Sequence, residues 1–425
     1  MIKQTKISRR GLLKGAGATA AFAGASTLGA PMIWAQNIKN VTLRQIGTGV
    51  SNLNEIAEKV KEDLGFTLTM TALDTDSAAQ RVATQPGSFD IADIEYISCK
   101  KVWPAGNLQA MDASKLDNYD KIAQTFRSGK LTPTSTIAQG TAPHTVGFVD
   151  GPNGKTFANN ESGWMTMVPT IYNADTLGIR PDLISRPIES WTELLNPEFK
   201  GKASILDISS IGIMDMAMVC EAMGEITYGD KGNMTKEEID KTLAIFTEAK
   251  KNGQFRAFWK TFDESVNLMA SGEVVIQSMW APAITAVKSR GIPCVYQPLK
   301  EGYRSWGGGI GIAASLSGLE KDAAYEYINW YLSGWTGGFL MRQGYYSAVP
   351  ETSKNFMTDN EWGYWFEGKP ATGDITSPFG DKLAVAGETR DGGSFYERMG
   401  AVKCWNSVMK ENQYMVRKWN EFIAA

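Results

Sequence analysis

The sequence of 425 residues contains a single histidine, His144, which lies beside Pro143. Hydrolytic triads, cysteine–histidine pairs and H-E-x-x-H metal sites need histidine, so each would have to use this one residue. A P-loop and a G-x-G-x-x-G motif are also absent. The 46 acidic residues offer many carboxylate pairs for hydrolysis, but none stands out. We therefore expect no enzyme, no cofactor and no metal, and we expect His144 to be an exposed loop residue.

Cysteine is scarce as well, with Cys99, Cys220, Cys294 and Cys404 far apart and no C-x-x-C pair. This spacing indicates neither a zinc site nor a thioredoxin-like motif. In an oxidising compartment the four residues could form one or two disulfides, whose pairing the sequence does not give. Buried free thiols are the alternative, and both interpretations stay open here.

No run of about 18 apolar residues follows the first 35 residues, so no membrane-spanning helix is predicted. The N-terminal segment Ser8-Arg9-Arg10-Gly11-Leu12-Leu13-Lys14 is close to a twin-arginine signal, and an Ala/Gly-rich stretch follows at 15–30. We predict cleavage after Ala35, with a permanent N-terminal anchor as the alternative. The twin-arginine export machinery is then a partner, and the mature protein is periplasmic.

Residues 1–35 contain five basic and no acidic residues, which leaves 38 basic and 46 acidic residues in the mature chain. The resulting formal net charge of −8 argues against nucleic acid or an anionic membrane surface as a partner. The remaining 390 residues are enough for two domains of ordinary size, and we expect a monomer.

Strands predicted at 41–46, 66–70 and 89–94 alternate with helices that end near Gly65 and Thr84. This alternation predicts an α/β fold with a mostly parallel sheet and helices on both faces. Ligands gather at the carboxyl ends of the strands in such sheets. The candidate residues there are Ser51, the predicted N-cap of the first helix, and Glu95 and Tyr96 after the third strand.

A segment rich in Gly, Asn and Pro, 141–163, precedes a second alternating region. Trp164, Asp207 and Ser209 lie at the ends of its elements and join the candidates. The predicted elements are a strand at 164–173, a helix and turn at 190–200 opened by a capping box of Ser190 and Glu193, a strand at 203–206, a helix at 236–251 capped by Thr235, helices at 320–332 and 337–343, and a helical tail from Tyr396.

Two tryptophans lie at element ends between Ser271 and Ala314. The β-branched residues 274–276 lead into Trp280, and a helix is predicted at 283–290. A strand at 294–297 and a turn then place Trp306 before the glycines 307–309. Aromatic walls beside accessible backbone suit sugars, apolar side chains or cations held over a ring face, whereas burial in the core is the alternative for both tryptophans.

The order of these motifs resembles the bacterial extracellular solute-binding proteins of ABC importers, in the branch that includes the spermidine and putrescine binders. The motifs are the strand from Gly272-Glu273-Val274 to Trp280, the segment PLKEG at 298–302 before Trp306, and ESWTELLNPEFKGK at 189–202. The resemblance implies a two-lobe periplasmic-binding-protein fold of type II, with a small-molecule ligand in a cleft between the lobes and an ABC permease as partner. The implied parts are a signal peptide at 1–35, a first lobe at 36–145 and 304–390, a second lobe at 146–303, and a C-terminal helical tail at 391–425.

The chain departs from the polyamine binders of this family at acidic positions. Gly308 stands where they carry an acid after the second tryptophan, and Asp207 is followed by Ile208-Ser209-Ser210 without a second carboxylate. The turn GTGVSN at 47–52 also differs from their W-x-E-Y type of turn. These departures argue against a long polyamine. One cationic head group facing Asp93, Glu95 or Asp207 is still compatible with the sequence.

We therefore predict a periplasmic binding component of an ABC transporter that captures a small organic solute and delivers it to the permease. Its predicted ligand-binding residues are Ser51, Glu95, Tyr96, Trp164, Asp207, Ser209, Trp280 and Trp306. The alternatives to ligand binding are that Asp207 caps the following helix and that Glu95 is solvated. Tyr345 and Tyr346 resemble the paired tyrosines of ferric-ion binders, but their context matches a structural G-Y-x-x-x-P turn. The alternative functions are a twin-arginine-exported enzyme with a cofactor, and a ligand-presenting subunit of a membrane sensor.

Overall fold

The computed structural model describes residues 38–131 and 135–425. Residues Asn37–Ala425 form one compact unit. The predicted signal peptide lies outside the described residues. Among the described helices, none is long and apolar enough to cross a membrane.

The first part of the chain alternates strands and helices as predicted. β1 pairs in parallel with both β2 and β3, which makes it the centre of a three-stranded parallel section. Burial alternates along β1 and then becomes continuous toward its carboxyl end. The elements of this part are β1 (Thr42–Thr48), α1 (Asn54–Leu64), β2 (Thr67–Leu73), α2 (Thr75–Thr84), β3 (Ile91–Glu95) and α3 (Cys99–Val102).

A second parallel section has β9 at its centre, between β10 and β11. The helix α6 has the predicted bounds, and Thr235 caps it in a capping box with Glu238. The elements of this part are β9 (Ala203–Leu206), α5 (Ser209–Ala222), α6 (Lys236–Lys251), β10 (Phe255–Trp259), α7 (Phe262–Ser271), β11 (Ile276–Met279), α8 (Ala281–Ser289) and β12 (Val295–Gln297).

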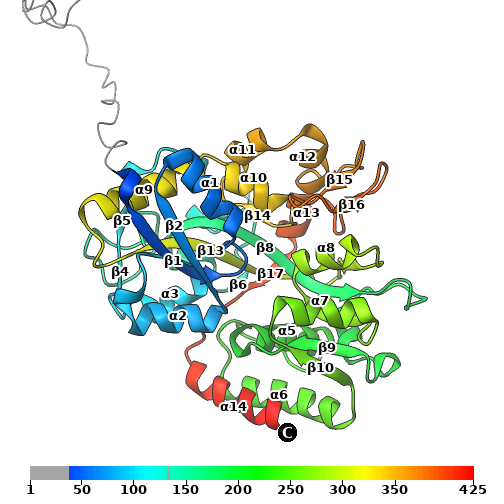
Figure 1. Ribbon diagram of the computed structural model, residues 1–425. Helices are drawn as coiled ribbons and strands as arrows, with labels where there is room; N and C mark the ends of the chain where they lie inside the picture. The colour runs from blue at the N-terminus through cyan, green and yellow to red at the C-terminus, as the bar shows by residue number, and fades with distance from the viewer. Residues whose placement is uncertain (1–37, 132–134) are drawn as a thin grey trace, which may run out of the picture. The chain divides into compact units, whose positions relative to one another are not determined.

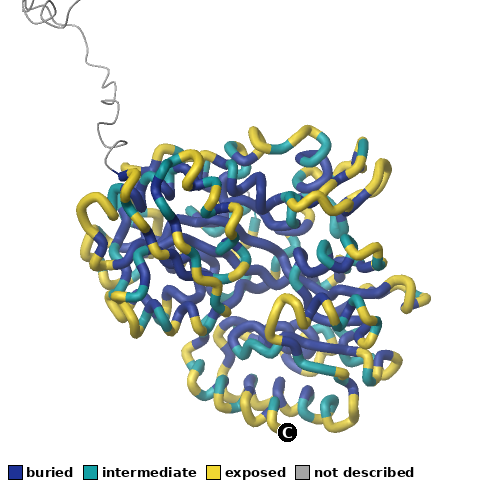
Figure 2. The backbone as a smooth tube through the Cα atoms, in the orientation of Figure 1, coloured by how far each residue is buried: buried dark blue, intermediate teal, exposed yellow. Residues whose placement is uncertain are grey.

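Two long antiparallel strands, β8 (Val168–Ile179) and β13 (Tyr303–Ala313), join the two parallel sections. The first half of β8 pairs with β13, and its second half pairs with β11 and β12. The resulting strand order is β10-β9-β11-β8-β13-β3-β1-β2. Both joining strands are buried along their whole length, as the dark central segments of Figure 2 show.

Helices cover both faces of each parallel section, which is the layer arrangement that the sequence predicts. In Figure 1, α1 and α9 (Gly318–Leu332) lie together on the first section, and α2 and α3 lie on its other side. The second section has α5, α6 and α14 (Asn412–Ala424) on one side and the contacting helices α7 and α8 on the other.

The residues after α9 add short elements around the joining strands. β14 pairs with β8, and β17 pairs in parallel with β13. These later elements are α10 (Trp335–Met341), β14 (Tyr346–Ser347), α11 (Pro350–Ser353), α12 (Asp359–Trp365), β15 (Ile375–Thr376), β16 (Lys382–Ala384), α13 (Phe395–Gly400) and β17 (Val402–Trp405). Earlier short elements are β4 (Leu108–Gln109), β5 (Met111–Asp112), α4 (Gln124–Arg127), β6 (Gln139–Gly140) and β7 (Trp164–Met165).

Two large hydrophobic cores correspond to the two sections. The first draws on residues up to Ala174 and again from Tyr303 onward, and the second contains Leu177 to Leu299 together with α14. The change from one core to the other therefore falls within β8. The lobe boundaries predicted after residues 145 and 303 stay predictions.

Three local predictions are wrong. Ser51 does not cap α1, because that helix begins at Asn54 after Leu53. Ser190 caps only a short 3₁₀ turn (Trp191–Leu195), and Glu193 binds Arg186 instead of closing a capping box. The C-terminal tail is not helical throughout, since β17 interrupts it and joins the sheet.

Candidate functional site

The predicted binding residues of the first section gather at the carboxyl ends of β1 and β3. These strands are parallel, with Gly47 opposite Asp93, so the turn after β1 lies beside the end of β3. The approach is close, since a Cβ on Gly47 would lie 2.2 Å from the Asp93 carbonyl oxygen. Glycine is therefore needed where the turn passes β3.

Ser51 is buried in this turn and donates a hydrogen bond to the Asp93 carboxyl, with 2.5 Å between Oγ and Oδ2. Burial raises the pKa of Asp93 to about 7, although the hydrogen bond with Ser51 opposes this shift. The Thr170 hydroxyl opposes the shift in the same way. Asp93 is thus a buried carboxyl group with no basic side chain bound to it.

Glu95 lies two residues further along β3 and therefore faces the same side as Asp93. Thr75 donates to its Oε1 at 2.8 Å, and Asn406 donates to its Oε2 at 3.0 Å. Burial raises the pKa of Glu95, and these two hydrogen bonds oppose the shift. The alternative of a solvated Glu95 is therefore wrong.

Gly308 stands directly opposite Glu95 in the antiparallel pair of β13 and β3. A Cβ at this position would lie 3.1 Å from Thr170 Oγ1 and 3.8 Å from Asp93 Oδ1, so the glycine faces the Asp93 side of the strand at close quarters. Asp93 thus lies close to Gly308, on the neighbouring strand β3.

Trp306 precedes Gly308 by two residues and shares its face of β13. Its ring meets Tyr345 edge to face, with 5.9 Å between the ring centroids. About 9% of Trp306 is exposed, so the ring lies at the boundary of the first core. The sequence did not point to Tyr345 as its neighbour, because Tyr345 was assigned to a structural turn.

In the second section, Trp280 directly follows β11 and is the N-cap residue of α8. It is half-buried and meets Trp259 edge to face at 4.8 Å. Because β9 and β11 are parallel, Asp207 after β9 emerges at the same edge of the sheet. The predicted residues of this section thus gather at one edge, as those of the first section do.

Asp207 is already engaged by two partners that sequence reasoning missed. Trp419 of α14 donates its indole N–H to Oδ1 at 2.7 Å, and Lys260 forms an ion pair with Oδ2 at 3.2 Å. Asp207 does not cap α5, whose N-cap residue is Ile208. Ser209 opens that helix, and the buried hydroxyl of Ser210 has no partner among the described residues.

A buried chain of polar contacts joins the two sections beneath these residues. Arg304 of β13 donates to Asp215 of α5 at 2.6 Å and to Asn406 at 2.8 Å, and it pairs with Asp175 of β8 at 3.3 Å. Asn406 in turn binds Glu95. A charged residue inside an otherwise buried strand is the signal that could have identified Arg304, whereas nothing local marks Asn406.

Two predicted residues lie apart from this group. The Tyr96 ring is in the first core, and its hydroxyl donates to the Met167 carbonyl at 2.9 Å. Trp164 is half-buried in β7, opposite Asp112. Their role as ligand contacts remains a prediction without support from these contacts.

The cysteines, His144 and the paired tyrosines, which were the other candidates for chemistry, are all buried or half-buried in the fold. All four cysteines are free and buried, and burial raises their thiol pKa values to about 12. His144 is half-buried, and burial lowers its pKa, so the prediction of an exposed residue is wrong. Tyr345 and Tyr346 are buried. The described residues contain no group of three or more histidine, cysteine or acidic side chains that could hold a metal ion.

Several solved structures have a similar fold. A putative spermidine/putrescine ABC transporter from Listeria monocytogenes is 13% identical, with 90% of this chain and 98% of that chain covered and a TM-score of 0.62. The spermidine/putrescine substrate-binding protein from Streptococcus pneumoniae, solved with calcium and HEPES, is 13% identical. The match covers 90% of this chain and 97% of that chain, with a TM-score of 0.58. A binding protein from A. tumefaciens R10 in complex with agropinic acid is 14% identical. The match covers 74% of this chain and 85% of that chain, with a TM-score of 0.53.

At these identities the structural likeness shows the two-lobe periplasmic-binding-protein fold and no more. No curated protein matches the sequence. The profile of the bacterial extracellular solute-binding proteins, however, matches residues 55–336, which is more than half of the chain. This chain therefore belongs to the bacterial extracellular solute-binding proteins.

Proposed function

We propose that this protein is the periplasmic substrate-binding component of an ABC importer, and that it holds a small organic cation between its two sections. The observation that carries the cation is the shared face of Asp93 and Glu95, opposite the glycine at 308. Among the described residues no base is bound to the buried Asp93, and the charge of Arg304 reaches Glu95 only through Asn406. The charge of a cationic ligand would therefore offset the burial of these carboxyl groups.

The aromatic side chains support the same ligand class. Trp306 shares the face of Gly308, and Trp280 lies at the strand edge of the other section. Tryptophan is the aromatic ring that holds a cation best over its face. In the proposed complex Trp306, Asp93 and Glu95 bind from one section, and Trp280 closes on the ligand from the other. Ser51 and Ser209 are the proposed hydrogen-bonding residues.

A ligand with one ammonium group fits better than a long polyamine. In the second section both oxygens of Asp207 are occupied, by Trp419 and Lys260. A second ammonium group would therefore have to displace Lys260 or remain without a carboxylate partner. We propose that the solute is an amine or quaternary ammonium compound with a neutral or polar distal end.

Transport requires that the closed, ligand-bound form is distinguished from the open form. We propose that ligand binding shifts the population toward the closed form, which an ABC permease then recognises. We further propose that residues 1–35 are a twin-arginine signal that is removed after export. Replacing Arg9 and Arg10 by lysine should then retain the protein in the cytoplasm, as cell fractionation would show, and normal export of that variant would contradict the proposal.

A thermal-shift panel tests the ligand class. The purified protein is heated with putrescine, spermidine, glycine betaine, choline, amino acids, sugars or organic acids, each at millimolar concentration. A ligand present at about 100 times its dissociation constant adds roughly 2.7 kcal/mol to the stability, which corresponds to a shift of a few degrees. We expect a shift with a monocationic compound. A shift with sugars or organic acids alone would contradict the proposed cation.

A further inference from the structure

A pocket lies on the other face of the joining strands. Along β13, Tyr303 and Arg304 point to opposite faces, and Arg304 belongs to the polar chain beneath the candidate site. Arg398 of α13 lies over the Tyr303 ring at 5.3 Å and donates to the carbonyl of Ala174 in β8 at 3.0 Å. Arg398 thus marks the face away from the candidate site.

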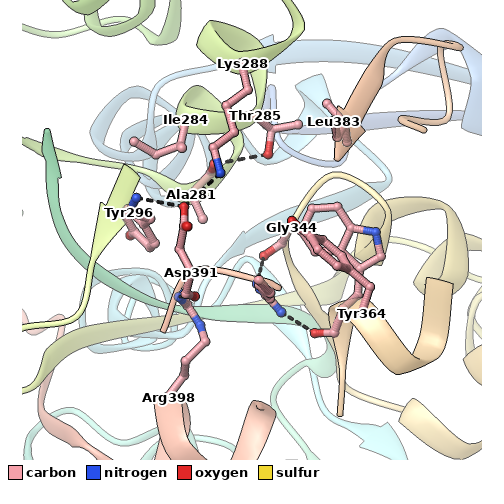
Figure 3. Close-up of a pocket in the computed structure, with 12 residues that line it drawn as sticks. Ala281, Ile284, Thr285, Lys288, Tyr296, Gly344, Tyr364, Leu383, Asp391 and Arg398 are labelled. Atoms are coloured by element: carbon pink, nitrogen blue, oxygen red, sulfur yellow. Dashed lines mark hydrogen bonds and ion pairs between the residues drawn. The ribbon is translucent and has the colours of Figure 1, made fainter. Parts of the chain in front are cut away.

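The pocket opens between α8 and the segment from Gly344 to Arg398, and its cavity volume is about 30 Å³. Figure 3 shows Lys288 descending from α8 toward Asp391, with Arg398 below them and Tyr364 on the far side. The cavity therefore lies between α8 of the second section and the elements that follow α9.

Three cations line this pocket, Lys288, Arg390 and Arg398, and Asp391 is the one carboxylate among its lining residues. Asp391 binds Lys288 at 3.0 Å and also accepts the backbone N–H of Tyr296 at 3.0 Å. The charge of Asp391 also acts on Arg390 and Arg398, so one carboxylate is shared by three cations. In the part of the chain that the structure describes, the guanidinium groups of the two arginines donate to carbonyl oxygens and bind no carboxylate.

The positive charge of Arg390 is only partly compensated by its surroundings. Its side chain donates to the carbonyl oxygens of Trp365 and Gly344, and it lies over the rings of Tyr346 and Trp365. Burial lowers its pKa to about 10, and the positive charge of Arg398 adds to this effect. The aromatic faces offset part of the burial cost, but a buried cation is stable chiefly when an anion accompanies it.

Two buried donors that belong to lining residues have no acceptor in the described structure. They are Nε of Arg398 and Nε1 of Trp365. Arg398 is 1% exposed and Trp365 is 5% exposed, so bulk water does not satisfy them. Unpaired donors beside an excess of positive charge are what an oxyanion would satisfy.

We propose that this pocket is a second binding site, separate from the solute site, and that it takes a small oxyanion, a carboxylate or a phosphate. The oxyanion accepts hydrogen bonds from the Trp365 indole and from Arg398, and its charge balances Arg390. Because α8 and α12, which contains Trp365, lie on opposite sides of the pocket, the bound anion connects these two helices.

Isothermal titration calorimetry of the full protein with inorganic phosphate and, separately, with acetate tests this site. We expect saturable binding of at least one probe, and which probe binds distinguishes a phosphate from a carboxylate site. Trp365→Phe keeps the ring and removes the free donor, so binding should weaken several-fold. The matched control is Trp362→Phe in the same helix, because the Trp362 indole already donates to Glu367, outside the pocket lining.

Two further variants change the charge with opposite signs. Asp391→Asn removes the competing carboxylate and should tighten anion binding, whereas Lys288→Met should weaken it. Misfolding would not produce opposite changes, and circular dichroism checks the fold of each variant. Trp280→Ala should leave anion binding unchanged, which separates this site from the proposed solute site. Absence of binding of both probes to the wild-type protein, or equal affinities in all variants, would overturn the proposal.

Discussion

Asp93 makes the stability of the protein depend on pH. In an unfolded chain an aspartate titrates near 3.9, whereas burial raises the pKa of Asp93 in the folded protein to about 7. The folded protein therefore keeps a proton that the unfolded chain loses between about pH 4 and pH 7. In that window the free energy of unfolding should fall as the pH rises, by roughly 3 kcal/mol in total from this one group.

The variant Asp93→Asn should remove this slope, because the amide stays neutral and can still accept from Ser51. Urea unfolding at pH 4.5 and pH 7.5 measures the effect, with the exposed Asp263→Asn as the control for the loss of one carboxylate. The stability of Asp93→Asn relative to the wild type should improve on going from the lower to the higher pH. Parallel pH profiles for the two proteins would contradict the raised pKa.

At the scale of single residues, the sequence predicted where a residue lies in a strand or turn better than which side chains it contacts. Trp280 follows a strand as predicted, because β-branched residues and a proline mark that place. Trp306 instead lies within the long strand β13, which the sequence did not predict. The partner of Glu95 is Asn406, 311 residues away, and that of Asp207 is Trp419, 212 residues away. Contacts at such separations depend on tertiary packing, which a single sequence does not reveal.

At the scale of elements, α14 secures the second section by polar contacts at the edge of its apolar face. Trp419 and Phe422 are buried in the second core, and the Trp419 indole binds the Asp207 carboxylate. A hydrogen bond to a charged acceptor is worth about 1.5–3 kcal/mol. Trp419→Phe keeps an aromatic ring and loses the donor, so the free energy of unfolding should fall by about 2 kcal/mol.

The control for this prediction is Trp103→Phe, since the Trp103 indole donates to a neutral acceptor, the Gly154 carbonyl, at 3.2 Å. Loss of this hydrogen bond should lower the free energy of unfolding by about 1 kcal/mol. Both values come from urea unfolding followed by circular dichroism. An equal loss in the two variants would show that the Asp207 carboxylate adds nothing to the attachment of α14.

Elements with complete local signals were predicted best. The helix α6 has its cap at Thr235, its apolar stripe and its bounds where the sequence placed them. Ser190 has the same capping pattern, but Arg186 competes for Glu193 with two hydrogen bonds. The strand β17 was missed because its four residues are held by pairing with β13 and β6, not by a pattern of their own.

At the scale of the whole molecule, the two sections share a sheet through β8 and β13 and share a polar chain through Arg304. The alternation of strands and helices predicted the parallel sections. It did not predict that the joining strands are antiparallel to their neighbours, because direction is not visible in a local pattern. Family membership confirms the expectation of a solute-binding protein that is not an enzyme.

The central claim is that one solute lies between the two sections and contacts Trp280. Calorimetric titration of the solute with the largest thermal shift should give one site per chain in the wild-type protein. Trp280→Ala should weaken binding by about 1.4 kcal/mol or more, which is tenfold in the dissociation constant. Trp335→Ala, which removes a ring that packs on Trp330 and Phe339 in the first section, is the control and should bind as the wild type does. Equal affinity of Trp280→Ala and the wild type would contradict the account.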